Sequence, residues 1–243
     1  MSRMSTFRFK RFEVVNERSA MKVNTDGVLL GALMCLKSSD RRLLDVGTGT
    51  GTIALMAAQR LDGTARIDAV DIDPDSADEA TANFRRSPWA ENLHAYNNSL
   101  ESYSSILDEG IRYDLIFSNP PYFEASQEAP EKRRSNARHT SSGLSYRELL
   151  DFAQERLDED GRFAIVLPAE QELPLTRYAR MCGLHLFRMT RIRTVPRKNP
   201  NRIVAEFSRS RCEAPEDWTL TIQDEGKYTQ EYLSLMHDFY LFA

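Results

Sequence analysis

The chain has 243 residues, 41% of them hydrophobic and 28% charged, which is enough for one sizeable core and is ordinary for a soluble protein. It contains no apolar run close to the ~18 residues that a membrane span requires and no apolar signal core near its first residue, so we expect a cytoplasmic protein. The three cysteines are far apart without a C-x-x-C spacing, and the four histidines show no ligand spacing, so we expect neither a disulfide framework nor a bound metal.

The net charge is −4, but the charges are unevenly distributed along the chain. Basic residues crowd the stretch 177–211, where Glu206 is the single acid, and a second basic cluster lies at 132–138. Because the local field decides whether a polyanion binds, a weakly acidic protein with a basic face can still bind nucleic acid.

The N-terminal stretch is expected to form an arm over the core. The alternating phenylalanines of residues 7–15 are typical of a strand or hairpin, and Thr25 with Asp26 is a plausible N-cap pair for a helix over the apolar run 28–36. The arm either serves only as a lid on the core, or its residues, Lys22 and Thr25 among them, also line a ligand site.

A ligand-binding pattern follows the strand expected at 41–46. The sequence there runs Gly47-Thr48-Gly49-Thr50-Gly51 and leads into a helix expected at 53–61. Glycines at a strand-to-helix turn let the backbone approach a ligand closely, and the helix N-terminus offers unpaired N–H groups. The next strand, 65–71, ends in Asp71, 20 residues after the last of these glycines, where an acid can hold ribose hydroxyls.

A third strand is expected at 93–97, after a helix at 75–86, and ends in Asn98 and Ser99. Many adenosine-binding sheets use an acid at this place to accept the adenine amino group. Asn98 or Ser99 could fill that role less strongly, and the alternative is a plain turn.

The fourth strand, expected at 113–118, ends at Asn119-Pro120-Pro121-Tyr122. The prolines lack N–H groups and cannot continue a strand ladder, so the motif delivers an amide, a rigid carbonyl and an aromatic ring to the edge of a sheet. The Asn119 oxygen and the Pro120 carbonyl can each accept one N–H of an exocyclic amine, while Tyr122 stacks on the base. The alternative is a Pro-Pro turn with asparagine as a turn former.

The rest of the chain continues to alternate strands and helices. The polar stretch 124–143 follows the proposed site, and we expect it to be a wall that orders on substrate. The stretches 184–195 and 202–208 are expected to form a long two-stranded arm, whose joining loop carries Arg197 and Lys198 and is either a solvated tip or a phosphate contact. Further helices are expected at 146–157, 173–182 and 228–242, and further strands at 162–167 and 218–222.

This alternation predicts an α/β fold, a mostly parallel sheet with helices on both faces, in one domain. An arm and helix at 1–40 would cover the site, and 41–243 would form the sheet core. Ligands bind such sheets beyond the carboxyl ends of the strands, so the glycine turn, Asp71, Ser99 and Asn119 should meet at one crevice.

The cofactor that fits this crevice is S-adenosylmethionine. A ribose-binding acid and a glycine turn indicate a nucleoside, and the P-loop lysine of ATP and GTP sites is absent. Gly47 and Gly49 would admit the amino-acid tail, with Asp45 near its ammonium. Methyl transfer would be an in-line displacement that needs no general base, because the sulfonium is already activated and positioning supplies most of the effect. A base inside a helix or stacked loop would have to swing out.

The residues at 43–51 and the Asn-Pro-Pro-Tyr motif resemble the class I methyltransferases that act on amino or amide nitrogen. Other stretches are similar to the bacterial tRNA1(Val) adenine-N6 methyltransferase family, which modifies the adenine just 3′ of the anticodon. These stretches are 21–31, Ala137-Arg138-His139, the loop 197–200 before 202–207, and the tail 228–232 with 238–241.

The resemblance implies a Rossmann-like, mostly parallel seven-stranded sheet with one antiparallel strand near the C-terminus, and a basic face for a tRNA partner bound at its anticodon region. We also expect no membrane contact and no obligate protein partner. The residues expected to bind the cofactor are Lys22, Thr25, Asp45, Gly47, Thr48, Gly49, Gly51, Asp71, Ile72, Asn98, Ser99 and Asn119. The residues expected to act on the adenine are Asn119, Pro120, Pro121 and Tyr122, and those expected to bind the RNA are Phe123, Arg138, Arg197 and Lys198.

Three other functions fit parts of the sequence. A protein glutamine-N5 methyltransferase also uses Asn-Pro-Pro-Tyr, but it usually carries a separate N-terminal helical domain, and only about 40 residues precede the sheet here. An rRNA guanine-N2 methyltransferase is another enzyme alternative. A non-catalytic RNA-binding protein is the alternative from a different class, and the intact glycine turn argues against it.

Overall fold

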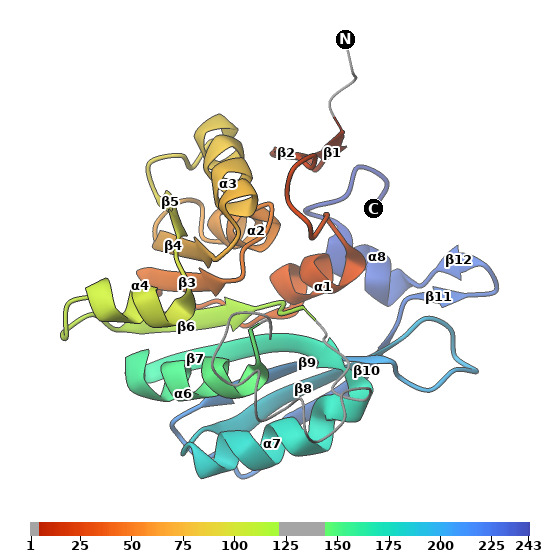
Figure 1. Cartoon of the computed structure of the whole chain (residues 1–243). Coiled ribbons are helices and arrows are strands. Elements are labelled where there is room, and N and C mark those ends of the chain that lie inside the picture. Colours follow the sequence, from red (N-terminus) through yellow and green to blue (C-terminus); the bar gives the residue numbers. More distant parts are fainter. Residues whose placement is uncertain (1–4, 122–143) are drawn as a thin grey trace, which may run out of the picture.

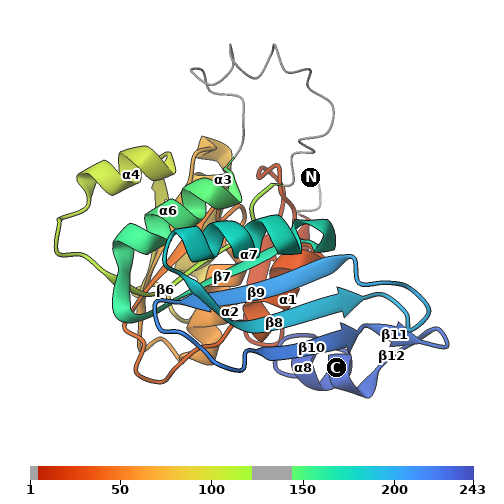
Figure 2. The same cartoon turned by 90° about the horizontal axis from the view of Figure 1, so that it is seen from below.

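The computed structural model describes residues 5–121 and 144–243 and has a twisted sheet with helices packed on both faces (Figures 1 and 2). Within the described residues the sheet has eight strands in the order β10-β8-β9-β7-β6-β3-β4-β5. Its strands are β3 (Arg42–Val46), β4 (Arg66–Asp71), β5 (Leu93–Asn97), β6 (Tyr113–Ser118), β7 (Leu157–Pro168), β8 (His185–Arg193), β9 (Arg202–Ser208) and β10 (Glu216–Thr221). Two hairpins lie outside it, β1 (Thr6–Arg8) with β2 (Glu13–Val15) and β11 (Gln223–Asp224) with β12 (Lys227–Tyr228).

The predicted fold class is confirmed, with one added strand. Every neighbouring pair in the sheet is parallel except β7–β9 and β8–β9, so β9 alone runs against the others. The sheet has eight strands rather than seven because β10 pairs in parallel with β8 at the outer edge. The reversed β9 places the loop between β8 and β9 at the same edge as the carboxyl ends of the parallel strands.

The helices divide between the two faces of the sheet. In β6, Leu115 and Phe117 pack in one hydrophobic cluster while Ile116 packs in the other, as the two-residue period of a strand requires. The first cluster includes residues of α1, α2, α3 and α8, and the second includes residues of α4, α6 and α7. Their bounds are α1 (Thr25–Leu33), α2 (Thr52–Arg60), α3 (Pro74–Arg86), α4 (Leu100–Ile106), α6 (Tyr146–Arg156), α7 (Glu172–Met181) and α8 (Gln230–Met236), with a 3-10 turn at Ala169–Gln171.

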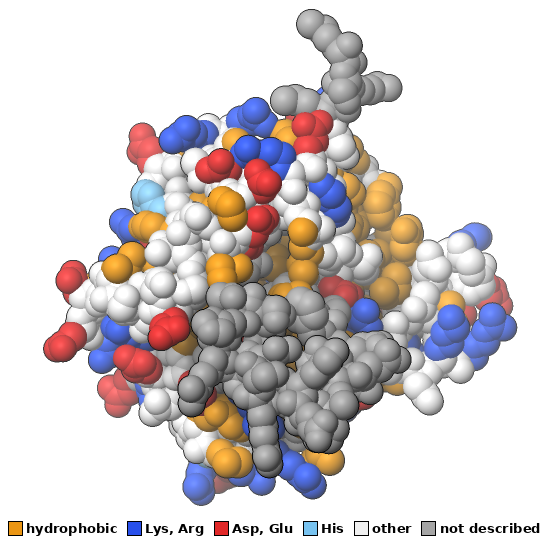
Figure 3. Space-filling model, viewed as in Figure 1, with side chains coloured by type: hydrophobic (Ala, Val, Ile, Leu, Met, Phe, Trp, Pro, Cys, Tyr) orange, Lys and Arg blue, Asp and Glu red, His pale blue; other side chains and the backbone are white. Residues whose placement is uncertain are grey.

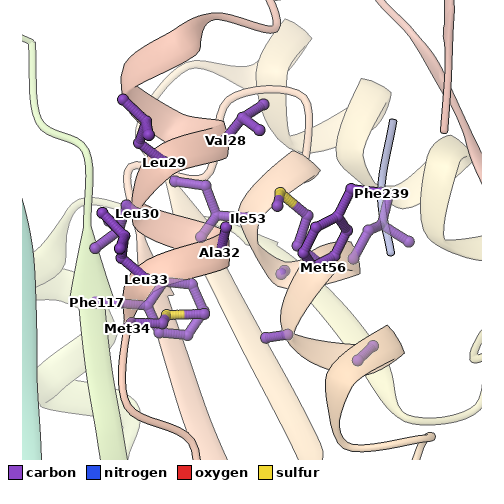
Figure 4. Close-up of a cluster of buried hydrophobic side chains, with 14 of the residues drawn as sticks. Val28, Leu29, Leu30, Ala32, Leu33, Met34, Ile53, Met56, Phe117 and Phe239 are labelled. Carbon is purple, nitrogen blue, oxygen red and sulfur yellow. The ribbon is translucent and has the colours of Figure 1, made fainter. Parts of the chain in front are cut away.

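Helix α1 is buried along most of its length, between the sheet and α2 (Figure 4). A Cβ added to Gly31 would come 2.7 Å from the sulfur of Met56 in α2, so a glycine is required at this contact. The helix begins at Thr25 with Asn24 as its N-cap, whose side chain accepts a 2.8 Å hydrogen bond from the N–H of Gly27. The expected N-cap pair Thr25-Asp26 was therefore one residue late, and the helix ends before the predicted 36.

Three further features of the structure differ from what the sequence led us to expect. The stretches 184–195 and 202–208 are not an arm: β8 and β9 lie inside the sheet, and five central residues of β9 are buried because the strand is covered on both faces. Helix α4 was not expected, because its sequence is polar and short. The last helix is shorter than 228–242, because 227–228 pairs as a strand and α8 ends at Met236.

Candidate active site

The strand ends that the sequence singled out lie side by side at one edge of the sheet. Strands β6, β3, β4 and β5 are consecutive and parallel, so their carboxyl ends share that edge. The Ser118 hydroxyl donates to the Val46 carbonyl at 2.7 Å, and the Gly47 N–H donates to the Val70 carbonyl at 2.8 Å. The N–H of Asn98, which follows β5, donates to the Asp71 carbonyl at 3.0 Å and so links the ends of β5 and β4. The glycine turn, Asp71, Asn98 and Asn119 therefore surround one region. The crevice predicted from the sequence had Ser99, the next residue, in the place of Asn98.

The glycine turn needs its glycines for its own conformation. Gly47, Gly49 and Gly51 have φ values of 72°, 55° and 80°, which L side chains rarely adopt. A Cβ on Gly51 would also lie 2.5 Å from the ring of Phe84 in α3. The N–H of Gly49 donates to the Asp71 carboxylate at 2.8 Å, so the turn and the acid after β4 are locked together.

Asp45, at the end of β3, is fully buried and only half satisfied. Its Oδ2 accepts a 2.8 Å hydrogen bond from the Thr48 hydroxyl, whereas its Oδ1 is buried and has no hydrogen-bond partner among the described residues. Burial raises the pKa of Asp45 to about 7, and the charge of Asp71 adds to this effect. Burial likewise raises the pKa of Asp71, although N–H groups of Gly49 and Asp73 hydrogen-bond its carboxylate. An acceptor without a donor at this position suits an ammonium group.

The end of β4 also presents an apolar side chain to solvent. Ile72 is 71% exposed directly after Asp71, although burying an isoleucine is normally favourable. The backbone there is held by Asn97, whose side-chain amide donates to the carbonyls of Asp71 (3.1 Å) and Ile72 (3.0 Å). Asn97 was not predicted as a site residue, because the last residue of a strand carries no motif of its own.

Ser99 also has a structural role, because it is the N-cap of α4. Its hydroxyl caps α4, since it accepts the N–H of Ser102 at 3.1 Å and donates to the Ser102 hydroxyl at 2.9 Å. A hydroxyl engaged in this way is a weaker candidate for an adenine contact than the neighbouring Asn98.

Asn119 is 5% exposed at the end of β6, and its amide nitrogen faces the N-terminal arm. The nitrogen lies 3.4 Å from Oδ1 of Asn24 and 3.6 Å from the sulfur of Met21. Pro120 is buried after it, and Pro121 is partly exposed. The other expected residues of this region, Tyr122, Phe123 and Arg138, lie outside the described residues.

The arm that contacts Asn119 is fixed by a buried acid of α3. The Glu79 carboxylate is 3% exposed and accepts three consecutive backbone N–H groups, those of Glu17 (2.7 Å), Arg18 (2.8 Å) and Ser19 (3.0 Å). Charge-assisted hydrogen bonds of this kind are about twice as strong as neutral ones. The sequence signal was a glutamate on the apolar face of an amphipathic helix, but its partner is backbone some 60 residues away.

One turn further along α3, Asn83 joins the arm to the glycine turn. Its amide nitrogen donates to the carbonyls of Val15 (3.0 Å) and Thr50 (2.9 Å), and its oxygen accepts the N–H of Val15 at 2.9 Å. Thus α3 positions two walls of the same region at once.

Of the three arm residues that could line a ligand site, Lys22, Thr25 and Asp26, the first two are exposed. The ammonium of Lys22 donates to the carbonyl of Glu17 at 2.7 Å, and Thr25 is the first residue of α1. Asp26 instead forms an ion pair with Arg202 at 2.8 Å, which ties α1 to the start of β9.

The basic stretch 177–211 is less uniformly basic in space than in sequence. Arg188 pairs with the buried Glu206 and with Glu216, and Arg191 pairs with Glu172 and Asp217. These arginines are therefore neutralised by acids from other elements. Arg197 and Lys198 are exposed in the loop between β8 and β9, so they remain candidates for contact with a polyanion.

The described residues contain neither a cluster of metal ligands nor a membrane-spanning helix. No three His, Cys, Asp or Glu side chains gather closely enough to hold a metal ion. None of the described helices combines the length and the apolar character that crossing a bilayer requires.

Known structures and curated proteins resemble this chain. The crystal structure of a predicted O-methyltransferase from Agrobacterium tumefaciens has a TM-score of 0.65 at 16% identity and covers 88% of this chain and 96% of its own. A precorrin-6y C5,15-methyltransferase of Geobacter metallireducens has a TM-score of 0.55 at 14% identity and covers 82% of this chain and 94% of its own. Both likenesses concern the fold.

Two curated relatives carry one name, tRNA1(Val) (adenine(37)-N6)-methyltransferase. The relative from Parabacteroides distasonis is 43% identical over 97% of this chain and 97% of its own length. The relative from Yersinia enterocolitica is 39% identical over 99% of this chain and 94% of its own length.

Residues 19–183 match the methyltransferase small domain model, and together with the fold this match defines a class I methyltransferase. Since the relatives match over nearly the whole chain, this chain belongs to the family of the tRNA1(Val) (adenine(37)-N6)-methyltransferases.

Proposed function

We propose that the protein transfers the methyl group of S-adenosylmethionine to the N6 atom of an adenine in tRNA. The observation that carries this proposal is the meeting of four strand ends at one edge, with the glycine turn after β3, Asp71 after β4, Asn98 after β5 and Asn119 after β6. Because its tRNA substrate is found there, the enzyme would act in the cytoplasm.

The residues present fit S-adenosylmethionine. The orphaned Oδ1 of Asp45 suits the cofactor's ammonium, and Gly47 and Gly49, which have no side chains, would let the amino-acid tail come close to the backbone. Asp71 would take the ribose hydroxyls, and the exposed Ile72 would pack on the adenine ring. The cofactor supplies a methyl group on a positively charged sulfur, which makes that group ready for displacement.

The chain's own part in the reaction is to position the amine. An aromatic amine is a poor nucleophile, because its lone pair is delocalised into the ring. If the Asn119 oxygen and the Pro120 carbonyl each accept one N–H, the lone pair localises and points at the methyl carbon. The contact of the Asn119 amide nitrogen with Asn24 helps to decide which end of the carboxamide is the acceptor.

We also propose a particular substrate, the adenine 3′ of the anticodon in tRNA1(Val). The relatives are named for adenine 37 of that tRNA. That base lies in a stacked loop and would have to swing out to reach Asn119. Tyr122 and Phe123 would stack on it, and Arg138, Arg197 and Lys198 would hold the backbone.

The relatives favour this reaction over the alternatives. Protein glutamine methylation, rRNA guanine methylation and non-catalytic RNA binding find no support in the names of the relatives, and the relatives match almost end to end. The test is mass spectrometry of nucleosides from a tRNA1(Val) transcript incubated with the protein and labelled S-adenosylmethionine. We expect labelled N6-methyladenosine from the transcript and none from a transcript with guanine at position 37. Labelled product from the guanine transcript would show that the protein methylates another base. If neither transcript is labelled, tRNA methylation is refuted.

A further inference from the structure

A ladder of aromatic rings runs from the N-terminal hairpin to the end of the chain. The ring of Phe9 stacks on Tyr240 with centroids 6.0 Å apart, and Tyr240 contacts Phe242 at 4.9 Å. Phe242 stacks on Tyr228 at 5.3 Å with only 13° between the planes, and Tyr228 stacks on Tyr232 at 5.1 Å. The ladder joins the N-terminal hairpin to the last part of the chain, residues 228–242.

The ladder is buried at both ends and exposed in the middle. Phe9, Tyr240 and Tyr232 are 4%, 9% and 3% exposed, whereas Phe242 and Tyr228 between them are 58% and 41% exposed. Isolated exposed rings are common on protein surfaces, but these two are stacked nearly parallel and held by buried rings beneath them. Figure 3 shows hydrophobic side chains gathered on this side of the molecule, with lysine and arginine side chains on the lobe beside them.

Basic residues lie next to the exposed ring pair. Lys227 directly precedes Tyr228 in β12, and the hairpin β11–β12 is attached to the loop that carries Arg197 and Lys198. The attachment is a 2.9 Å hydrogen bond from the Gln223 N–H to the Thr194 carbonyl, and Figures 1 and 2 both show the hairpin beside that loop. Of the two acids of the hairpin, Asp224 is the cross-strand partner of Lys227, and Glu225 lies at the turn.

This surface is also connected to the proposed active site. The loop leads into Arg202, which pairs with Asp26 in the first turn of α1 at 2.8 Å. The same helix is capped by Asn24, which contacts Asn119. Hence one rigid element touches both the end of the basic loop and the amide proposed to hold the target adenine.

We propose that the exposed pair Tyr228–Phe242 is a platform on which an unpaired base of the tRNA substrate stacks, while Arg197, Lys198 and Lys227 hold the neighbouring phosphates. This inference rests on the proposed function. Aromatic rings beside a row of cations are the usual means of binding unpaired nucleotides, because every base has a face that stacks and every linkage carries a charge. The rings are already stacked, so little ordering is needed when the base arrives.

The test compares ring removal with ring retention. Tyr228→Ala and Phe242→Ala remove the stacking surface, whereas Tyr228→Phe and Phe242→Tyr keep it. Leu241→Ala is a matched control, since Leu241 is 65% exposed beside the platform but has no ring. Fluorescence anisotropy at fixed salt measures the affinity of each variant for the tRNA1(Val) transcript, calorimetry measures the affinity for S-adenosylmethionine, and light scattering measures the oligomeric state.

We expect each alanine variant to bind the transcript about 5- to 100-fold more weakly, with cofactor affinity unchanged and both ring-retaining variants close to the original protein. Unchanged tRNA affinity in both alanine variants would overturn the platform. An equal loss of tRNA affinity in Leu241→Ala would also overturn it, because the rings would then have no special role. A change of oligomeric state without a change in tRNA affinity would overturn it too, because the patch would then be an apolar contact between copies. If the original protein transfers no methyl group to the transcript, the proposed function is refuted instead. This outcome differs from the outcomes that would overturn the platform alone.

Discussion

The amide nitrogen of Asn119 lies 3.4 Å from the Oδ1 atom of Asn24, the same oxygen that accepts a 2.8 Å hydrogen bond from Gly27 at the start of α1. One side-chain oxygen thus caps a buried helix and faces the amide that is proposed to hold the substrate. The orientation of that amide therefore depends on the N-terminal arm as well as on its own strand.

Replacing Asn24 should uncouple these two roles. Asn24→Ala removes the cap, which costs about 1 kcal/mol of stability, and leaves the Asn119 amide less well oriented, so we expect kcat to fall by about tenfold. Asn24→Asp keeps an oxygen acceptor and a good cap and should stay close to the original protein. Single-turnover kinetics and thermal unfolding measure the two effects, and an alanine variant that loses stability but keeps its rate would show that the arm does not orient Asn119.

Asn119→Ala should abolish methyl transfer. Losing one positioned hydrogen-bond partner typically costs about 10²- to 10³-fold in rate, and here the acceptor is proposed to act on the reacting amine itself. Affinity for S-adenosylmethionine, measured by calorimetry, should be nearly intact. Turnover that persists in this variant would count against the role of the amide.

Glu79 should stabilise the arm. Glu79→Ala leaves three backbone N–H groups without their shared carboxylate, so we expect a loss of about 2–4 kcal/mol in stability and weaker cofactor binding. Asp78→Ala is the matched control one residue away, because Asp78 forms only an exposed ion pair with Arg18 at 3.4 Å. Denaturant unfolding compares the two variants. Equal, small losses in both would mean that the arm is held by its other contacts.

Asp45 should make stability and cofactor binding depend on pH in opposite directions. Its pKa is raised from 3.8 to about 7, so between these values the folded protein holds a proton that the unfolded chain has released, and its contribution to stability falls as pH rises. An ammonium, in contrast, prefers the ionised carboxylate, so affinity for S-adenosylmethionine should rise about fivefold from pH 6 to 7.5. Asp45→Asn should remove both trends. Melting curves and calorimetry at several pH values test this, and an unaltered pH dependence in the asparagine variant would exclude Asp45 as its source.

The loop between β8 and β9 should contribute charge to RNA binding. Arg197→Ala combined with Lys198→Ala should weaken tRNA binding and reduce the slope of log affinity against log salt by about 1–2. Arg211→Ala is the control, because Arg211 is exposed but follows the other end of β9. A salt slope that stays the same in the double variant would remove the loop from the interface.

The sequence predicted best where local chemistry alone decides the structure. The bounds of β5 and β6 were predicted to the residue, because β5 stops at two consecutive asparagines and β6 is a short apolar stretch that stops before Asn119-Pro120. The convergence of Asp71 and Asn119 followed from the rule that parallel strands end at one edge. The features that the sequence did not reveal depend on partners far along the chain. Glu79 and Asn83 were not singled out because they bind distant backbone groups. Arg191 was counted as part of a basic face, although it pairs with Glu172 and Asp217.

The one reversed strand of the sheet has a consequence for evolution of the RNA contacts. A parallel successor to β8 would need a crossover, and its connection would leave the catalytic edge before returning. The reversal of β9 makes a short connection suffice, and that connection lies at the same edge as the carboxyl ends of the parallel strands. If this loop holds RNA as proposed, changes in its length or charge would alter the RNA contacts while the sheet stays as it is.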